Sequence, residues 1–239
     1  MLTIRQGLYC LFEGCDYSGK SSLSKEVCHR LSRTNTRVQL TAHPGATPLG
    51  RHLRILSKTP HAIDPEIEID PLSRQMLMFI DQVCFIKTIL TPFLESGGLM
   101  LADRSNYVSG IVYGTCAGVD LSSLNRMFKI AQSPAPDVMF ILSAPLEVLL
   151  ERRAKTLRQT AGDVFDHNTD FLEKVATTYD NLLSSSDVIL IMLSDYMRLG
   201  DIVYLDATKS TEELADEVMA KISQIQDKRR AFESPSYGA

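Results

Sequence analysis

The segment with the clearest chemical purpose runs from Gly14 to Ser22. Gly14, Gly19, Lys20 and Ser21 fit the spacing G-x-x-x-x-G-K-[ST], after an apolar run and before a helical pattern. Such a loop turns backbone N–H groups toward phosphate oxygens, its lysine reaches the β and γ phosphates, and its serine hydroxyl can ligate Mg²⁺. The segment therefore predicts a nucleotide-binding loop whose contacts come from Gly14, Ser18, Gly19, Lys20, Ser21 and Ser22.

Other polar residues are candidates for binding the metal ion and the second substrate. Asp103 and Arg104 follow a predicted buried strand, where the carboxylate can hold Mg²⁺-bound water or take a proton and the guanidinium fork suits a phosphate. Asp16, inside the loop, can accept a hydrogen bond from a sugar hydroxyl. The sequence contains no guanine-binding N-K-x-D segment and no long insertion typical of a mechanical ATPase. These features favour phosphoryl transfer to a small molecule.

Short apolar runs that alternate with helical patterns must position these residues. The alternation predicts an α/β protein with the P-loop NTPase fold, a five-stranded parallel sheet flanked by helices, and a helical lid. We expect strands over 7–13, 38–41, 99–102, 138–142 and 202–205, and helices over 20–34, 48–57, 71–96, 122–132, 145–157, 168–184 and 211–227. Pro92 is expected to kink the helix over 71–96. We expect one kinase domain over 1–227 with its lid at 152–167, an unassigned segment at 184–201 and a flexible tail over 228–239.

Composition narrows the class of protein. The 239 residues are 44% hydrophobic and carry a net charge of −4, so the chain lacks the basic excess of a nucleic-acid-binding surface. Its longest uninterrupted apolar run has six residues and is too short to cross a bilayer. Five widely spaced cysteines and no secretory signal pattern indicate a reducing compartment. We therefore expect a cytoplasmic protein that binds small molecules and has no nucleic-acid or membrane partner.

The order of the motifs resembles the thymidylate kinase family. Residues 12–22, FEGCDYSGKSS, are similar to its F-E-G-x-D-x-x-G-K-[ST]-[ST] loop, and residues 43–49 with Arg54 resemble its R-E-P-G-G-T segment and following arginine. Asp103, Arg104 and residues 109–113 resemble its D-R-Y-x-x-S-x-x-A-Y run with one extra residue. Residues 136–153 and 205–208 resemble its approach to the lid and its closing I-D-A-T strand. The likeness covers almost the whole chain in order.

This resemblance implies a homodimeric kinase that uses ATP and Mg²⁺ to phosphorylate a pyrimidine deoxynucleoside monophosphate, dTMP first among them. The loop carries Tyr17 and Ser18 where some family members have an arginine, so the cationic clamps are expected in the lid. The implied catalytic residues are Lys20, Asp103, Arg153 and Arg158, with Ser21 and Asp103 at the metal. The implied substrate-binding residues are Asp16, Arg54, Phe79, Gln82, Arg104, Ser109 and Tyr113.

Two departures from the family pattern leave the acceptor base open. Ala42-His43 stands where many members have Arg-Glu, and Gln82 stands at the position of an arginine that contacts the thymine carbonyl, if one residue is deleted. Arginine only donates hydrogen bonds, whereas an amide donates and accepts, so cytosine or a modified pyrimidine is an alternative base. Phe79, three residues earlier, is expected to stack on that base.

Two other functions stay open at this point. Asp103-Arg104-Ser105 resembles the [DE]-R-S motif of deoxynucleoside kinases, which phosphorylate the nucleoside itself. A nucleotide-binding regulator without activity is a third possibility, which the intact lysine, acidic residue and arginines disfavour.

Overall fold

Five parallel strands form the centre of the molecule in the computed structural model, which describes residues 6–159, 162–182 and 202–233. The spatial order is β2-β3-β1-β4-β5. All seven residues of the central strand are buried, because helices cover both faces of the sheet. The strand bounds are β1 (Leu8–Gly14), β2 (Val38–Ala42), β3 (Leu99–Asp103), β4 (Val138–Ser143) and β5 (Ile202–Asp206). The predicted α/β class and five-stranded parallel sheet are confirmed.

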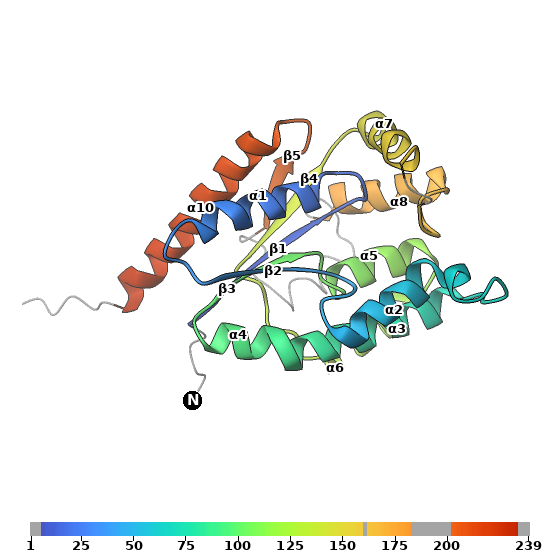
Figure 1. Cartoon of the computed structure of the whole chain (residues 1–239), viewed down its shortest axis with the longest axis horizontal. Coiled ribbons are helices and arrows are strands. Elements are labelled where there is room, and N and C mark those ends of the chain that lie inside the picture. Colours follow the sequence, from blue (N-terminus) through green and yellow to red (C-terminus); the bar gives the residue numbers. More distant parts are fainter. Residues whose placement is uncertain (1–5, 160–161, 183–201, 234–239) are drawn as a thin grey trace, which may run out of the picture.

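Helices α1 and α10 lie together on one face of the sheet, and α3, α4 and α6 lie on the other (Figure 1). α7 and α8 stand at the end of the sheet where the strands finish (Figure 1). The helix bounds are α1 (Lys20–Ser32), α2 (Pro48–Lys58), α3 (Pro71–Phe85), α4 (Thr91–Glu95), α5 (Val108–Cys116), α6 (Leu121–Ile130), α7 (Leu146–Leu157), α8 (Thr169–Asp180) and α10 (Thr211–Glu233), with a 3₁₀ turn η1 (Pro60–Ala62) and a π-helical turn η2 (Ile86–Leu90).

The register of the strands brings the polar residues to one edge of the sheet. Phe12 of β1 and Ala42 of β2 both pair with Asp103 of β3. The loops that follow these three strands therefore begin side by side at the carboxyl ends of the strands. Ligands of open parallel sheets bind at this edge.

Local capping explains where several helices begin. The Thr47 side chain accepts a hydrogen bond from the backbone N–H of Gly50 at 2.8 Å, and Asp70 accepts from Leu72 and Ser73 at the start of α3. Helix α1 differs, because its N-cap is Gly19 and no side chain caps it. Its first N–H groups are therefore oriented for a ligand at the helix N-terminus.

The predicted helix over 71–96 is confirmed as one continuous helical stretch, Pro71–Glu95, although it contains the π-helical turn η2 between α3 and α4. Pro92 sits in the first turn of α4, where its missing N–H is tolerated, and the wider π turn of Ile86–Leu90 precedes it. The stretch Pro71–Glu95 is long and apolar enough to span a membrane by length and composition alone. In this fold it packs beside α2, α5 and α6, and one such helix is weak evidence for a membrane span.

Two other differences from the sequence prediction concern helices. α5 was not predicted, because its residues VSGIVYGTC carry two glycines and no helical periodicity. α10 extends to Glu233, six residues beyond the predicted end, so the expected flexible tail is wrong for residues 228–233. Arg229 holds this last part of the helix through an ion pair with Asp137 and a 3.0 Å hydrogen bond to the Gly7 carbonyl. The segment 184–201 and residues 234–239 lie outside the described residues.

Candidate active site

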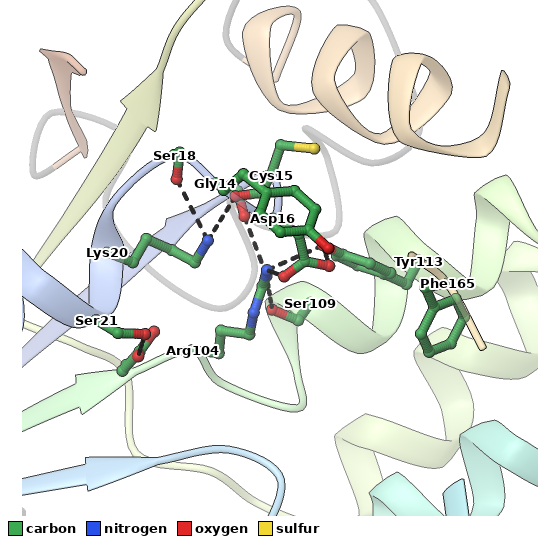
Figure 2. A network of polar contacts seen from close by, with 12 residues as sticks. Gly14, Cys15, Asp16, Ser18, Lys20, Ser21, Arg104, Ser109, Tyr113 and Phe165 are labelled. Atoms are coloured by element: carbon green, nitrogen blue, oxygen red, sulfur yellow. Dashed lines mark hydrogen bonds and ion pairs between the residues drawn. The ribbon is translucent and has the colours of Figure 1, made fainter. Parts of the chain in front are cut away.

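The phosphate-binding loop follows β1 directly and wraps the side chain of Lys20. The Lys20 ammonium donates to the Cys15 carbonyl at 2.6 Å and to the Ser18 hydroxyl at 3.3 Å (Figure 2). Burial, together with the nearby charge of Arg104, lowers the pKa of Lys20 to about 8. Gly14 has a φ of +135°, and a Cβ there would lie 2.5 Å from the Leu142 carbonyl oxygen. Only glycine fits this first turn of the loop.

The loop forms one wall of a cavity of about 850 Å³. Its other walls come from Arg152 and Thr156 of α7, from the segment after β5, from the segment after β2, and from α2, which carries Arg54. The Arg54 guanidinium donates to the Pro44 carbonyl at 2.9 Å. The loop N–H groups, the start of α1 and Lys20 make a basic cradle that fits the phosphates of ATP.

Ser21 and Asp103 meet at the floor of this cavity. The Ser21 hydroxyl donates a short hydrogen bond to Oδ2 of Asp103, which joins the start of α1 to the end of β3. A hydroxyl and a carboxylate are oxygen donors of the kind that Mg²⁺ takes together with water and substrate phosphates. The predicted metal residues are therefore adjacent and their chemistry fits the ion.

Arg104, Asp16 and Tyr113 form a compact polar cluster beside the loop (Figure 2). Arg104 donates to Oδ1 of Asp16 at 2.5 Å, to the Tyr113 hydroxyl at 2.9 Å and to the Gly14 carbonyl at 3.0 Å. Tyr113 donates in turn to Oδ2 of Asp16 at 2.8 Å. Burial raises the pKa of Asp16, but the charges of Arg104, Lys58 and Lys20 outweigh it and hold that pKa well below its ordinary value.

A buried acid supports this cluster from behind. Glu13 accepts from the Ser105 backbone at 2.8 Å, from the Ser109 hydroxyl at 2.8 Å and from the Tyr179 hydroxyl at 2.7 Å. One of its oxygens lies 4.0 Å from the Arg104 guanidinium. Burial raises the pKa of Glu13 above its ordinary value despite that charge. Ser109, predicted to bind substrate, is thus held between Glu13 and Arg104.

A second pocket adjoins the large cavity on the side of Arg104. The predicted residues Asp16, Arg104, Ser109 and Tyr113 all line it. Its remaining walls are formed by the segment after β2, the end of α2, helix α3, the turn before α5 and the lid, through His43, Pro44, Lys58, Gln75, Met78, Asn106, Gly110 and Phe165. Asp16, His43, Pro44, Lys58 and Arg104 line both cavities, so the two cavities adjoin, and we call the second one the acceptor pocket.

The structure does not bring Phe79 and Gln82 to either cavity. Phe79 packs edge-on against Phe128 with the ring centroids 6.1 Å apart. Gln82 is fully buried, accepts from the Asn106 backbone at 3.2 Å and donates to the Ser133 hydroxyl at 3.2 Å. Met78 and Gln75, which share a face of α3, line the acceptor pocket instead. The i, i+3 pair that lines a pocket is therefore Gln75 and Met78, one turn earlier in α3 than the predicted pair Phe79 and Gln82.

The basic run of α7 divides among different environments. Arg152 lines the large cavity and donates to the Ser18 carbonyl at 3.3 Å and the Ala207 carbonyl at 2.8 Å. Arg153 donates to the Thr169 hydroxyl at 2.8 Å, and Arg158 is exposed after the last turn of α7. Neither Arg153 nor Arg158 lines the two cavities described above. Arg152 is the arginine of this run that lines the large cavity, and it is not among the residues predicted from the sequence.

The lid residues 162–167 contact the acceptor pocket from above. Lys58, at the end of α2, pairs with Asp163 at 2.6 Å, and Tyr17 of the loop donates a short hydrogen bond to Asp166. Phe165 lies edge-on to Tyr113 with the ring centroids 5.8 Å apart. Lys58 lines both cavities and was missed, because a single lysine at a helix end has no distinguishing signal in the sequence.

A parallel sheet with this phosphate loop, a loop-side carboxylate and an arginine facing a second pocket defines a P-loop phosphotransferase acting on a small acceptor. The model of the family described as thymidylate kinase matches residues 12–218. The chain belongs to the thymidylate kinase family.

Individual relatives agree with this family. A thymidylate kinase of Halothermothrix orenii is 27% identical over 219 residues, covering 91% of this chain and 97% of the relative. One of Caldicellulosiruptor saccharolyticus is 31% identical over 172 residues, covering 71% and 80%. One of Deinococcus radiodurans is 26% identical over 220 residues, covering 92% and 98%. The chain therefore spans nearly the full length of two of these three relatives.

Proposed function

We propose that this protein transfers the γ-phosphoryl group of ATP to a pyrimidine deoxynucleoside monophosphate, with dTMP as the main acceptor. The observation that carries the proposal is the cluster of Arg104, Asp16 and Tyr113 beside the phosphate loop. The Arg104 fork provides donors for the acceptor phosphate, and the ionised Asp16 can accept a hydrogen bond from the 3′-hydroxyl. Membership of the thymidylate kinase family supports the same acceptor.

In this proposal most of the catalysis is positioning and charge stabilisation. Lys20 neutralises charge on the transferring phosphoryl group, and Arg152 approaches the donor phosphates from α7. Arg153 and Arg158 are proposed as lid cations that add to this charge when the lid closes further. Asp103 accepts a hydrogen bond from the Ser21 hydroxyl and could receive a proton from the acceptor phosphate. Ser21 and Asp103 would hold Mg²⁺, which when bound neutralises phosphate oxygens.

The alternatives differ in the acceptor they need. A deoxynucleoside kinase would leave Arg104 without an acceptor phosphate. A nucleotide-binding regulator would need no pocket beyond the phosphate loop, whereas here a second pocket adjoins the large cavity. Both features favour a monophosphate kinase.

A coupled assay of ADP release tests the proposal. The purified protein is incubated with ATP and Mg²⁺ and, separately, with dTMP, dUMP, dCMP, dAMP, dGMP and thymidine. We expect turnover with dTMP and none above background with thymidine. Turnover with thymidine but not with any monophosphate would favour the nucleoside kinase, and no turnover with any acceptor would favour the regulator.

We also propose a homodimer and a cytoplasmic location, the latter on the sequence arguments alone. Leu72, Met76 and Ile80 follow one another at four-residue spacing on α3 and are 43%, 50% and 45% exposed. Such an apolar stripe is typical of an interface. Light scattering of the native protein should give twice the chain mass, and a Met76→Glu variant should shift that mass toward the monomer. A monomeric native protein would contradict the dimer.

A further inference from the structure

Gln75 is a buried amide whose oxygen has no hydrogen-bond partner among the described residues. Its side chain belongs to α3, is only 3% exposed and lines the acceptor pocket. Within the described part of the chain, its Oε1 is fully shielded from solvent and accepts no hydrogen bond. A buried oxygen that receives no hydrogen bond costs free energy, so such atoms in native proteins call for an explanation. One explanation is a ligand that brings the missing hydrogen-bond donor into the pocket.

The opposite wall of the pocket leaves room for this amide. Gly110 and Gly114 of α5 face Gln75. A Cβ at Gly110 would lie 3.3 Å from Oε1 of Gln75, and a Cβ at Gly114 would lie 3.2 Å from its Cδ. Met78, one turn after Gln75, adds an apolar surface to the same pocket. The pocket therefore combines the apolar contact of Met78 with the amide of Gln75.

The contrast with Gln82 locates the available amide. Gln82 stands seven residues later on the same face of α3, and both ends of its amide have protein partners in Asn106 and Ser133. Gln82 therefore serves to join α3 to its neighbours. Gln75 is the glutamine of this helix that lies at the acceptor.

We propose that Gln75 recognises the hydrogen-bonding edge of the acceptor's pyrimidine base. Its Oε1 accepts from a ring N–H or an exocyclic amino group, and its Nε2 donates to the adjacent carbonyl or ring nitrogen. Thymine offers N3–H beside O4, and cytosine offers the N4 amino group beside N3. An amide matches either edge after a half-turn about its last bond. This inference rests on the proposed function and names the residue that selects the base.

A comparison of two substrates with two proteins tests the contact. The substrates are dTMP and its nonpolar isostere, the deoxyriboside monophosphate of 2,4-difluorotoluene, which keeps the shape of thymine but lacks its N–H and carbonyl groups. The proteins are the wild type and Gln75→Leu. We expect the wild type to prefer dTMP by about tenfold or more in kcat/KM. The reason is that the bound isostere would leave the buried Gln75 amide without hydrogen-bond partners, which costs free energy. Gln75→Leu should reduce this preference to about twofold, with the KM for ATP unchanged.

Gln82→Leu is the matched control, because it makes the same change on the same helix away from the pocket. It should lower the melting temperature while keeping the wild-type preference for dTMP over the isostere. Thermal unfolding checks that Gln75→Leu is folded, and Gln75→Met replaces it in the comparison if it is not. An unchanged preference in the folded Gln75 variant, or a lost preference in Gln82→Leu, would overturn the assignment to Gln75.

The failure of this inference is distinguishable from failure of the proposed function. A wild-type protein that phosphorylates dTMP but whose preference does not depend on Gln75 contradicts only the inference. A wild-type protein that phosphorylates no pyrimidine monophosphate contradicts the proposed function, and the inference falls with it.

Discussion

Nη2 of Arg104 lies 2.5 Å from Oδ1 of Asp16 and ties the end of β3 to the phosphate loop. Because Tyr113 donates to the other carboxylate oxygen, Asp16 is held from both sides. The neighbouring positive charges keep its pKa well below the ordinary value, so Asp16 is ionised throughout the neutral range. A sugar hydroxyl that enters the pocket therefore meets an acceptor already in place.

Asp16→Asn is expected to destabilise the protein in a pH-dependent way. The pKa of Asp16 is lower in the folded state than in the unfolded state, so its stabilising contribution is present above about pH 4 and is lost as the pH falls. At pH 7 the variant should lose about 1–3 kcal/mol in free energy of unfolding, because Arg104 keeps its other partners. Urea denaturation of both proteins from pH 7 to pH 3 measures the difference. A difference that stays constant below pH 4 would contradict this origin.

Lys20→Met is expected to abolish turnover while the fold remains intact. The substitution keeps the approximate length of the side chain but removes the ammonium group, which donates hydrogen bonds to Cys15 and Ser18 and is expected to face the phosphates. The loss of one such preorganised charge should reduce kcat by about 100-fold or more. Circular dichroism and thermal unfolding serve as the control for folding. Full activity in the folded variant would refute the assignment of the phosphate loop.

Much of the architecture could be predicted because it depends on local patterns. Each predicted strand lies within one residue of an observed strand at both ends, since a strand buried on both faces is a short apolar run bounded by turns. The phosphate loop is predictable for the same reason, because its glycines are required by backbone geometry at fixed spacing. Helix α5 has no such local signal and is stabilised by packing, with Gly110 close to Phe128 of α6.

The residues of α3 that line the acceptor pocket could not be predicted from the sequence for a different reason. Helical spacing tells which residues share a face, and Gln75 and Gln82 share one. It does not tell how far along the helix the pocket lies, which depends on where α5 and the turn at Asn106 cross α3. Sequence alone likewise does not distinguish Arg152 from Arg153, because both follow the buried Leu149 by about one helical turn on α7.

Arg152 and Arg153 of α7 and Arg158, which follows its last turn, are expected to differ in their contribution to turnover. Arg152 lines the cavity and contacts the Ser18 carbonyl, so Arg152→Ala should reduce kcat by about tenfold or more. Arg153→Ala and Arg158→Ala should reduce kcat by a similar factor only if further closure of the lid brings these side chains to the phosphates. Steady-state kinetics with dTMP and ATP compare the three variants. Wild-type turnover in both Arg153→Ala and Arg158→Ala would refute the lid-clamp proposal, and wild-type turnover in Arg152→Ala would refute the role of Arg152.

The last prediction concerns the choice between deoxyribose and ribose. Tyr113 is half-buried, its ring lies under the Arg104 guanidinium and against Phe165, and its hydroxyl donates to Asp16. The ring is therefore next to the carboxylate proposed to hold the 3′-hydroxyl, where it would crowd a substituent on C2′. If the ring excludes ribose, Tyr113→Phe should keep the preference of the wild type for dUMP over UMP, since it retains the ring and loses only the hydroxyl with its hydrogen bonds to Asp16 and from Arg104.

Tyr113→Ala should reduce that preference to about threefold or less, because it removes the obstruction. The two variants separate the steric effect of the ring from the hydrogen bond to Asp16, which both of them remove. The measurement is the ratio of kcat/KM for dUMP to kcat/KM for UMP in each protein. Equal ratios in the wild type and Tyr113→Ala would show that Tyr113 does not select the sugar, and a ratio lost already in Tyr113→Phe would assign the selection to the orientation of Asp16.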